Sequence, residues 1–292
     1  MRMRTAALAA ILTIATVACS GPAEEPSASA PPPSPQASSV PSATASDAAA
    51  VSPSPDVLTT PTIDGSFAVA DGRKLAIRCW GEGAPTVVLV GGHPSEGIAD
   101  FEMAPAFLRP LAERTRTCAY ARSGYPGSDP APNEPRDADD VIGDLDDLLT
   151  SAAVNGPYVL VGQSFGGMLV AYHAARFPED VAGVVLLDTP APDASLTLEQ
   201  IPEIAWDHPA NPEHTDTLAE FEHRFAQERL PIQAPLTVVT ATSGASSVED
   251  QSVWLDISPN ANQVELAGGH DIHLADPVGA ASEVLKMVDA SR

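Results

Sequence analysis

The sequence predicts an α/β domain with a mostly parallel sheet over residues 63–292. Short β-branched runs alternate there with longer stretches of helical pattern, which is typical of this fold class. Several of the runs are apolar at consecutive positions, as strands buried on both faces must be. The residues before position 63 have a different composition, and we exclude them from the domain.

The first residues of the chain predict an export signal. Two arginines precede an uncharged apolar run over residues 5–18, which is too short to cross a bilayer as a helix and predicts a signal peptide over residues 1–18. The end of this run at Cys19 resembles the bacterial lipobox, although Thr16 stands where that motif prefers leucine. The resemblance implies a lipoprotein: Cys19 carries fatty acid such as palmitate and anchors the exported protein in the cell membrane, facing outside.

The next segment, residues 19–62, is expected to tether the domain to this anchor. From residue 20 onward it has no aromatic residue and no Lys or Arg, and Pro, Ala and Ser dominate it. Such a segment cannot bury enough apolar surface to offset the entropy lost on ordering. We therefore expect a disordered tether, and contact with the lipid bilayer only through the N-terminal anchor.

The charge of the chain is strongly acidic. It has 39 Asp and Glu against 15 Lys and Arg, a formal charge of −24. Nucleic acid phosphates would repel such a protein, and anionic lipid would find no basic patch on it. We expect no nucleic acid partner.

Within the domain, eight strands and five helices are predicted. The turn Asp71-Gly72 separates the first two strands, and β-branched runs mark the others. The helical stretches fall between later runs. The predicted strands are 66–69, 74–80, 86–90, 116–120, 158–161, 183–188, 236–240 and 262–266, and the predicted helices are 100–114, 137–153, 165–176, 248–257 and 277–290.

The strongest motif is Gly162-Gln163-Ser164-Phe165-Gly166, which follows a predicted strand and opens a predicted helix. G-x-S-x-G in that context is typical of a nucleophile elbow. Side chains at Gly162 or Gly166 would clash with the neighbouring strand and helix. The hydroxyl of Ser164 would project above the sheet at a helix N-terminus, so Ser164 is the candidate nucleophile.

Together these features resemble the α/β-hydrolase superfamily along residues 63–292. Residues 122–129 are similar to the family loop D-R-x-G-x-G-x-S, with Ala121 in place of the usual Asp, and residues 176–181 are similar to its link after the nucleophile helix. The resemblance implies the α/β-hydrolase fold: an eight-stranded, mostly parallel sheet with flanking helices. It also implies a small lid, which we expect over residues 189–235.

A serine nucleophile needs a base and an acid. The family places the base after the last strand, where His270 follows two glycines; His273 is the nearest competitor. The acid follows either the sixth strand, which ends at Asp188, or the seventh, after which the first carboxylates are Glu249 and Asp250. We favour Asp188, with Asp250 and Glu249 as alternatives.

An oxyanion hole needs two backbone donors. The resemblance assigns one to the amide of Phe165. It assigns the other to the loop after the third strand, with the amide of His93 as the first choice and that of Gly92 as the alternative.

These residues predict acyl transfer to water by a serine hydrolase, without cofactor or metal. The expected substrate is a small carboxylic ester or a related acyl compound, and a carboxylic-ester hydrolase is the first interpretation. A peptidase or amidase of the same fold, or an inactive hydrolase-fold binding module, are the alternatives. A serine at the elbow disfavours epoxide hydrolase and haloalkane dehalogenase chemistry, which similar families run through an aspartate.

Two cysteines remain after Cys19. Cys79 and Cys118 fall on the predicted second and fourth strands, which are neighbours in the fold that the resemblance implies. In an oxidising exterior they are expected to form a disulfide bond.

Overall fold

The computed structural model describes residues 56–292 except 193, 195–196, 221–230 and 245. The predicted signal peptide, Cys19 and the tether up to residue 55 lie outside the described residues. In the part of the chain that is described, no helix is both long and apolar enough to cross a membrane.

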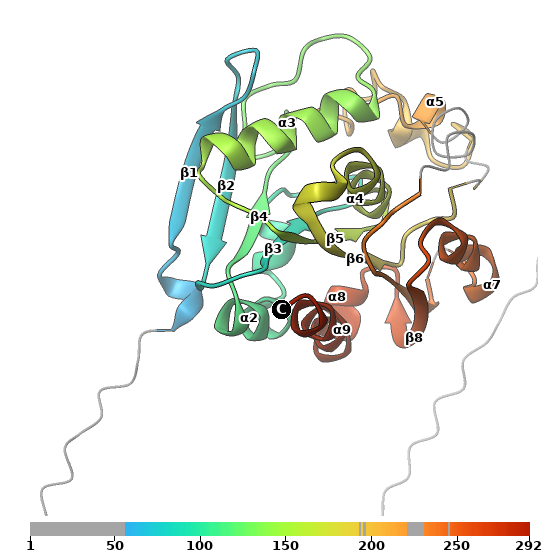
Figure 1. Cartoon of the computed structure of the whole chain (residues 1–292). Coiled ribbons are helices and arrows are strands. Elements are labelled where there is room, and N and C mark those ends of the chain that lie inside the picture. The colour runs from blue at the N-terminus through green and yellow to red at the C-terminus, as the bar shows by residue number, and fades with distance from the viewer. Residues whose placement is uncertain (1–55, 193, 195–196, 221–230, 245) are drawn as a thin grey trace, which may run out of the picture. The chain divides into compact units, whose positions relative to one another are not determined.

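A single eight-stranded sheet forms the centre of the domain (Figure 1). Its strand order is β1-β2-β4-β3-β5-β6-β7-β8. β2 pairs antiparallel with both of its neighbours, and every later pairing is parallel, so the predicted mostly parallel sheet is confirmed. The strands are β1 (Ile63–Ala68), β2 (Lys74–Trp80), β3 (Thr86–Val90), β4 (Thr117–Tyr120), β5 (Tyr158–Gln163), β6 (Val181–Leu187), β7 (Leu236–Ser243) and β8 (Ala261–Gly269).

Helices cover both faces of the sheet, with α3 and α4 on one face and α2, α8 and α9 on the other (Figure 1). The longer helices are α2 (Pro105–Arg114), α3 (Ala138–Ser151), α4 (Phe165–Arg176) and α9 (Pro277–Ala290). The shorter ones are η1 (Val57–Thr59), α1 (Ala99–Glu102), η2 (Pro178–Asp180), η3 (Pro202–Ile204), α5 (Thr217–Ala219), α7 (Val248–Gln251), η5 (Ser252–Ile257) and α8 (Ile272–Ala275).

Alternate residues of the central strands belong to two separate cores. In β3, Val88 and Val90 pack in the cluster that includes α3 and α4, whereas Val87 and Leu89 pack in the cluster that includes α2 and α9. All five residues of β3 are buried. This double burial explains why the strand is apolar at consecutive positions, as a parallel strand between two helical layers must be.

Several strand and helix ends differ from the prediction by one to three residues, and three assignments need a larger correction. The helix predicted over 100–114 is two helices, because Pro105 begins α2 and disfavours helical backbone at Ala104, whose φ and ψ are −112° and 60°. The helix predicted over 248–257 continues as η5 after α7. Residues 56–62, predicted as the end of the tether, belong to the folded domain, since η1 packs its apolar side chains on the core next to α2.

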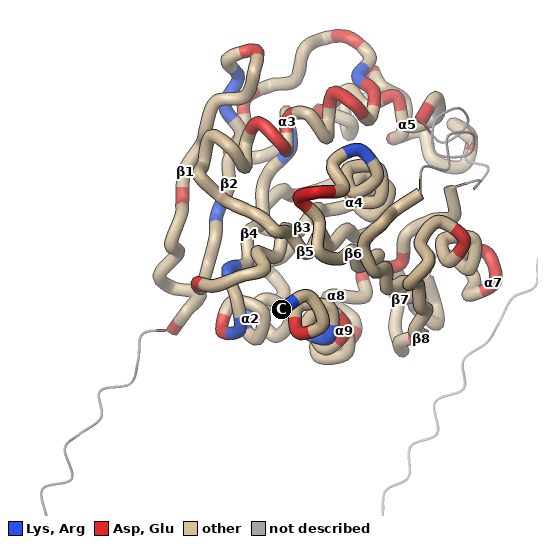
Figure 2. The backbone as a smooth tube through the Cα atoms, in the orientation of Figure 1, with Lys and Arg blue, Asp and Glu red and all other residues tan. Residues whose placement is uncertain are grey.

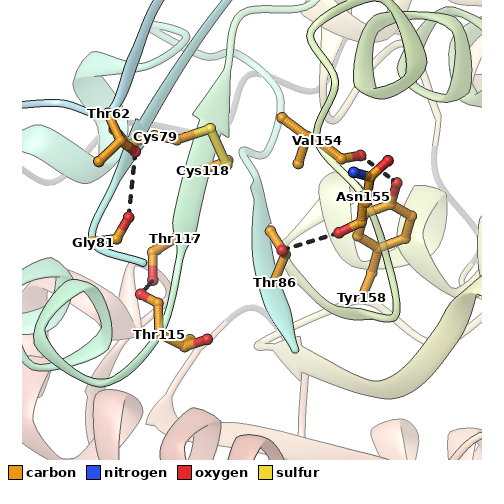
Figure 3. The surroundings of a disulfide bond; sticks show 10 residues. All are labelled: Thr62, Cys79, Gly81, Thr86, Thr115, Thr117, Cys118, Val154, Asn155 and Tyr158. Atoms are coloured by element: carbon orange, nitrogen blue, oxygen red, sulfur yellow. Dashed lines mark hydrogen bonds between the residues drawn. A yellow bond between two sulfur atoms is a disulfide. The ribbon is translucent and has the colours of Figure 1, made fainter. Parts of the chain in front are cut away.

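The predicted disulfide bond is present. Cys79 of β2 and Cys118 of β4 are register partners in the antiparallel pair and are bonded to each other (Figure 3). Both are fully buried, and the hydroxyl of Thr62 donates to the carbonyl oxygen of Cys79 beside them. The bond therefore fastens the antiparallel edge of the sheet to its parallel part.

Acidic residues lie along α3 (Figure 2). At its N-terminus Asp137 and Asp140 form a reciprocal capping box, in which each carboxylate accepts from the backbone of the other. Negative charge at that end also suits the helix dipole. Further along, Asp144 is mostly buried and pairs with Arg73 and Arg136. Part of the acidic charge therefore stabilises the start of α3 and ties it to the loops beside it.

Candidate active site

Ser164 sits on a sharp turn between β5 and α4. Its backbone has φ of 53° and ψ of −126°, a conformation that costs energy for any residue with a side chain. A Cβ on Gly162 would lie 2.3 Å from the carbonyl oxygen of Gly166, and a Cβ on Gly166 would lie 2.3 Å from that of Val90. Glycine at both positions therefore permits the close approach that forces the turn, as predicted.

The side chain of Ser164 meets His270. The Oγ of Ser164 is 2.8 Å from Nε2 of His270, although 106 residues separate the two in the sequence. His270 follows β8, and the side-chain amide of Gln163 donates to its carbonyl oxygen at 3.4 Å and to Oδ1 of Asp271 at 3.3 Å. Gln163, directly before the serine, thus holds the loop that carries the imidazole.

Asp188 completes a hydrogen-bonded series of three side chains. Its Oδ2 lies 2.6 Å from Nδ1 of His270, and its own side chain is fully buried. Because an ionised carboxylate can only accept, Nδ1 of His270 carries the hydrogen. Nε2 then faces the hydroxyl of Ser164 as the acceptor. This is the tautomer that a general base needs.

A backbone and a side-chain donor from the described residues also hold the other carboxylate oxygen of Asp188. The amide of Ala241 donates to Oδ1 at 3.1 Å and Nε2 of Gln251 donates at 2.9 Å. Burial alone would raise the pKa of Asp188, but the hydrogen bonds from His270, Ala241 and Gln251 outweigh it and lower the pKa. Asp188 is therefore ionised at neutral pH. Sequence reasoning missed Gln251, which lies 63 residues away.

The pKa of His270 shifts in the opposite direction. The hydrogen bond to Asp188 raises it above its ordinary value, against the effect of burial, which lowers it. The imidazole stays reachable, since 37% of its side chain is exposed. A base at this position is thus oriented by Asp188 and becomes a stronger proton acceptor.

The alternative residues lie elsewhere. Asp250 is exposed and takes part in a capping box with Ser247 at the start of α7, and Glu249 beside it is also exposed. His273 is buried with its ring 5.5 Å from that of Phe101. The structure brings His270 and Asp188 to Ser164, and it places these three alternatives in other contacts.

The predicted oxyanion donors flank the serine. Phe165 follows it as the first residue of α4. Gly92 approaches from the loop after β3, where an added Cβ would lie 2.9 Å from Cβ of Ser164. The ring of His93 lies edge-on to that of Phe165, with centroids 6.5 Å apart. The first turn of α4 and the loop after β3 therefore both lie next to the nucleophile, and their backbone amides are the candidates for an oxyanion hole.

Part of the predicted lid contacts the loop after β3. The carbonyl oxygen of Glu203 is 2.9 Å from Nε2 of His93, and a carbonyl can only accept, so Nε2 carries the hydrogen. Nδ1 then accepts from the hydroxyl of Tyr125 at 3.0 Å. Residues 221–230 of the lid lie outside the described residues. The described part of the chain contains no cluster of three or more His, Cys, Asp or Glu suited to a metal.

Comparison with known proteins agrees with this architecture. A family model described as alpha/beta hydrolase fold matches residues 85–216. The uncharacterized protein YqjL of Bacillus subtilis (strain 168) is 26% identical in an alignment of 239 residues that covers 74% of this chain and 89% of that protein. Three further curated relatives match shorter stretches, and the chain spans only 12%, 40% and 27% of their lengths.

Solved structures extend the likeness over more than three quarters of the chain. A thermophilic esterase from Thermogutta terrifontis aligns with a TM-score of 0.64 at 18% identity, covering 78% of this chain and 99% of that one. The enol-lactonase from Burkholderia xenovorans LB400 aligns with a TM-score of 0.62 at 18% identity, covering 77% and 99%. At these identities the likeness establishes the fold, and function has to be argued from the site.

Proposed function

We propose that this chain, which has the α/β-hydrolase fold, is a serine hydrolase that cleaves a small carboxylic ester through an acyl-enzyme. The support is the hydrogen-bonded series Ser164–His270–Asp188, assembled at a turn where the serine has a strained backbone. A serine hydroxyl is a weak nucleophile unless a base removes its proton. Nothing in ordinary packing requires a serine, an imidazole and a buried carboxylate in this order.

In the proposed reaction, Oγ of Ser164 attacks the acyl carbon while Nε2 of His270 takes its proton. The amides of Phe165 and His93 stabilise the negative charge that develops on the carbonyl oxygen. His270 then gives the proton to the leaving alcohol, which leaves an acyl group on Ser164. Water, deprotonated by His270, attacks this ester and releases the acid. Asp188 keeps the imidazole oriented and stabilises its charged form throughout.

Ester hydrolysis by matched serine variants tests the proposal. We expect the wild type to hydrolyse p-nitrophenyl acetate or butyrate, and Ser164→Ala to lose at least about 10³-fold in kcat/KM. Ser151→Ala, an exposed serine at the end of α3, is the control and keeps the wild-type rate. Full activity in Ser164→Ala would refute the proposal.

The ester preference has its own test. The amine that leaves from an anilide of the same acyl group is a poorer leaving group than the phenol of the ester and must be protonated to depart. A dedicated esterase therefore cleaves the anilide far more slowly. We expect kcat/KM for the ester to exceed that for the anilide by at least about 10³-fold, in keeping with the range of single catalytic effects. Comparable values for both would favour an amidase or peptidase.

We also propose that the enzyme works outside the cell, anchored in the membrane by a lipid on Cys19. The disulfide bond between Cys79 and Cys118 supports an oxidising location. Metabolic labelling with an alkyne-bearing palmitate in a bacterial host that processes lipoproteins tests this. The full chain should take up the label and Cys19→Ser should not. Label in Cys19→Ser, or an unlabelled wild type, would refute the anchor.

A further inference from the structure

The guanidinium of Arg122 is buried directly beside the loop after β3. Its two terminal nitrogens donate to the carbonyl oxygens of Gly91 at 2.5 Å and Gly92 at 2.7 Å. Its Nε donates to Oε2 of Glu213 at 2.8 Å. Only 3% of the Arg122 side chain and 1% of the Glu213 side chain are exposed. One side chain thus holds two consecutive peptide groups and is itself held by a buried carboxylate.

These two hydrogen bonds fix the direction of the backbone amides. The cis peptide bonds in this part of the chain precede prolines, so the Gly91–Gly92 and Gly92–His93 bonds are trans. In a planar trans peptide the carbonyl and the amide hydrogen point in opposite directions. With both carbonyls turned toward Arg122, the amides of Gly92 and His93 point away from it. The amide of His93 is the first choice for the second oxyanion donor and that of Gly92 is the alternative, and the Gly92 backbone lies against Ser164.

Glu213 is a firm anchor for Arg122. The segment that follows Glu213 is fixed by two backbone hydrogen bonds to residue 136. The amide of Arg136 donates to the carbonyl oxygen of His214, and the carbonyl oxygen of Arg136 accepts from the amide of Asp216, both at 2.9 Å. A Cβ on Gly124, two residues after Arg122, would lie 2.1 Å from the carbonyl oxygen of Pro212. The loop carrying Arg122 therefore packs directly on the segment that carries Glu213.

Stability alone is a poor explanation for this arrangement. Removing an arginine and a glutamate from water carries a large desolvation penalty, and apolar side chains of similar size often serve folding as well or better. A guanidinium, however, offers several donors in a rigid plane. That geometry suits the task of aligning two neighbouring carbonyls.

We propose that Arg122, anchored by Glu213, is a positioning residue that aims the amides of Gly92 and His93 at the oxyanion. The inference rests on the proposed function, because it assigns a role within the same reaction. The proposal also gives residues 203–213 a role in positioning the oxyanion donors. Glu213 holds the side chain of Arg122, and the carbonyl oxygen of Glu203 holds the side chain of His93.

Arg122→Lys tests the inference, because a single ammonium nitrogen cannot hold Glu213 and both carbonyls with the geometry of the guanidinium. With p-nitrophenyl butyrate we expect kcat to fall about 10²-fold, in the range for a lost or misplaced oxyanion donor, while KM changes less than about 3-fold. The affinity for a boronic acid that mimics the tetrahedral intermediate should fall by a similar factor. The midpoint of the pH profile should not move, since His270 and Asp188 are untouched.

Arg136→Lys is the matched control. Arg136 is equally buried at 3%, and its hydrogen bonds go to the carbonyl of Asp140 and the carboxylate of Asp144. Its Nη1 also forms an ion pair with Oε1 of Glu213 at 3.9 Å, beyond hydrogen-bond distance, and a lysine keeps the positive charge of that contact. This variant should lose thermal stability as Arg122→Lys does but keep kcat within about 2-fold of the wild type, the scatter usual for positions outside an active site.

The outcomes separate cleanly. Arg122→Lys with kcat and boronic acid affinity within 2-fold of the wild type would overturn the inference. If Arg122→Lys does not fold, Glu213→Gln decides, since it keeps the shape and removes only the charge: a roughly 10-fold loss of kcat supports the inference and an unchanged kcat overturns it. Ser164→Ala is measured alongside. Turnover that does not need Ser164 overturns the proposed function as well, whereas Ser164-dependent turnover unaffected by Arg122 overturns only the inference.

Discussion

Ser164 and Asp188, which directly follow two adjacent parallel strands, both have a positive φ, of 53° and 45°. The two turns are joined, because the amide of Ser164 donates to the carbonyl of Leu187 at 3.0 Å. Backbone strain of this kind persists only where the surroundings enforce it. Here it turns two side chains toward the same edge of the sheet, where the imidazole of His270 lies between them.

The first prediction concerns the acid. Asp188→Asn should lower kcat about 10⁴-fold, because an amide favours the wrong imidazole tautomer and cannot stabilise the charged ring. Asp250→Asn removes a carboxylate from an exposed capping box and should keep the wild-type kcat. Steady-state ester hydrolysis by both variants checks this. If Asp250→Asn alone lost its turnover while staying folded, the assignment of Asp188 would be wrong.

The second prediction concerns pH. The neutral form of His270 is the base, and the hydrogen bond to Asp188 raises its pKa above the ordinary value. We therefore expect kcat/KM to rise with pH through a midpoint above about 6.5 and then level off. In Asp188→Asn the remaining effect of burial should move the midpoint lower. A profile that is flat from pH 5 to 9 would contradict the role of His270.

Local sequence signals predicted much of this architecture. β3, α4 and α9 have the predicted bounds, because each is marked by a signal that acts over a few residues. The signal is a continuous apolar run for β3, a glycine-flanked turn before α4, and a proline after an aspartate cap for α9. The break at Pro105 was missed, although the proline itself signalled it. Gln251 and the pair Arg122–Glu213 could not be found this way, since their contacts join residues 63 and 91 positions apart.

The third prediction concerns a buried histidine away from the site. His173 of α4 is buried, its ring nitrogens have no hydrogen-bond partner among the described residues, and burial lowers its pKa to about 4. In the unfolded chain the imidazole takes up a proton below about pH 6.5, so stability is complete above that pH and falls as the pH drops toward 4. The loss reaches roughly 3 kcal/mol, at 1.36 kcal/mol per pKa unit.

Urea unfolding at pH 7 and pH 4.5 checks this prediction. His173→Leu should lose less stability between the two pH values than the wild type. His208→Leu, a change at a half-buried histidine whose Nδ1 accepts from the amide of Ala210, should follow the wild type. Parallel losses in all three proteins would show that His173 is not responsible.

The fourth prediction concerns the disulfide bond. Cys79 and Cys118 are 39 residues apart, and closing a loop of that length is worth about 4 kcal/mol in the chain-entropy account. Reduction should therefore lower the free energy of unfolding by roughly 2–4 kcal/mol. Urea unfolding with and without a phosphine reductant measures it. Equal stability under both conditions would mean that the bond does not constrain the unfolded chain as expected.

The most direct test of the central claim is covalent labelling of the nucleophile. A fluorophosphonate reacts with a serine only where a base activates it and an oxyanion site receives the phosphoryl oxygen. Peptide mapping should find one adduct, on Ser164, and the labelling rate should fall steeply in Asp188→Asn and vanish in Ser164→Ala. An adduct on a different serine, or labelling of Ser164→Ala at the wild-type rate, would contradict the account.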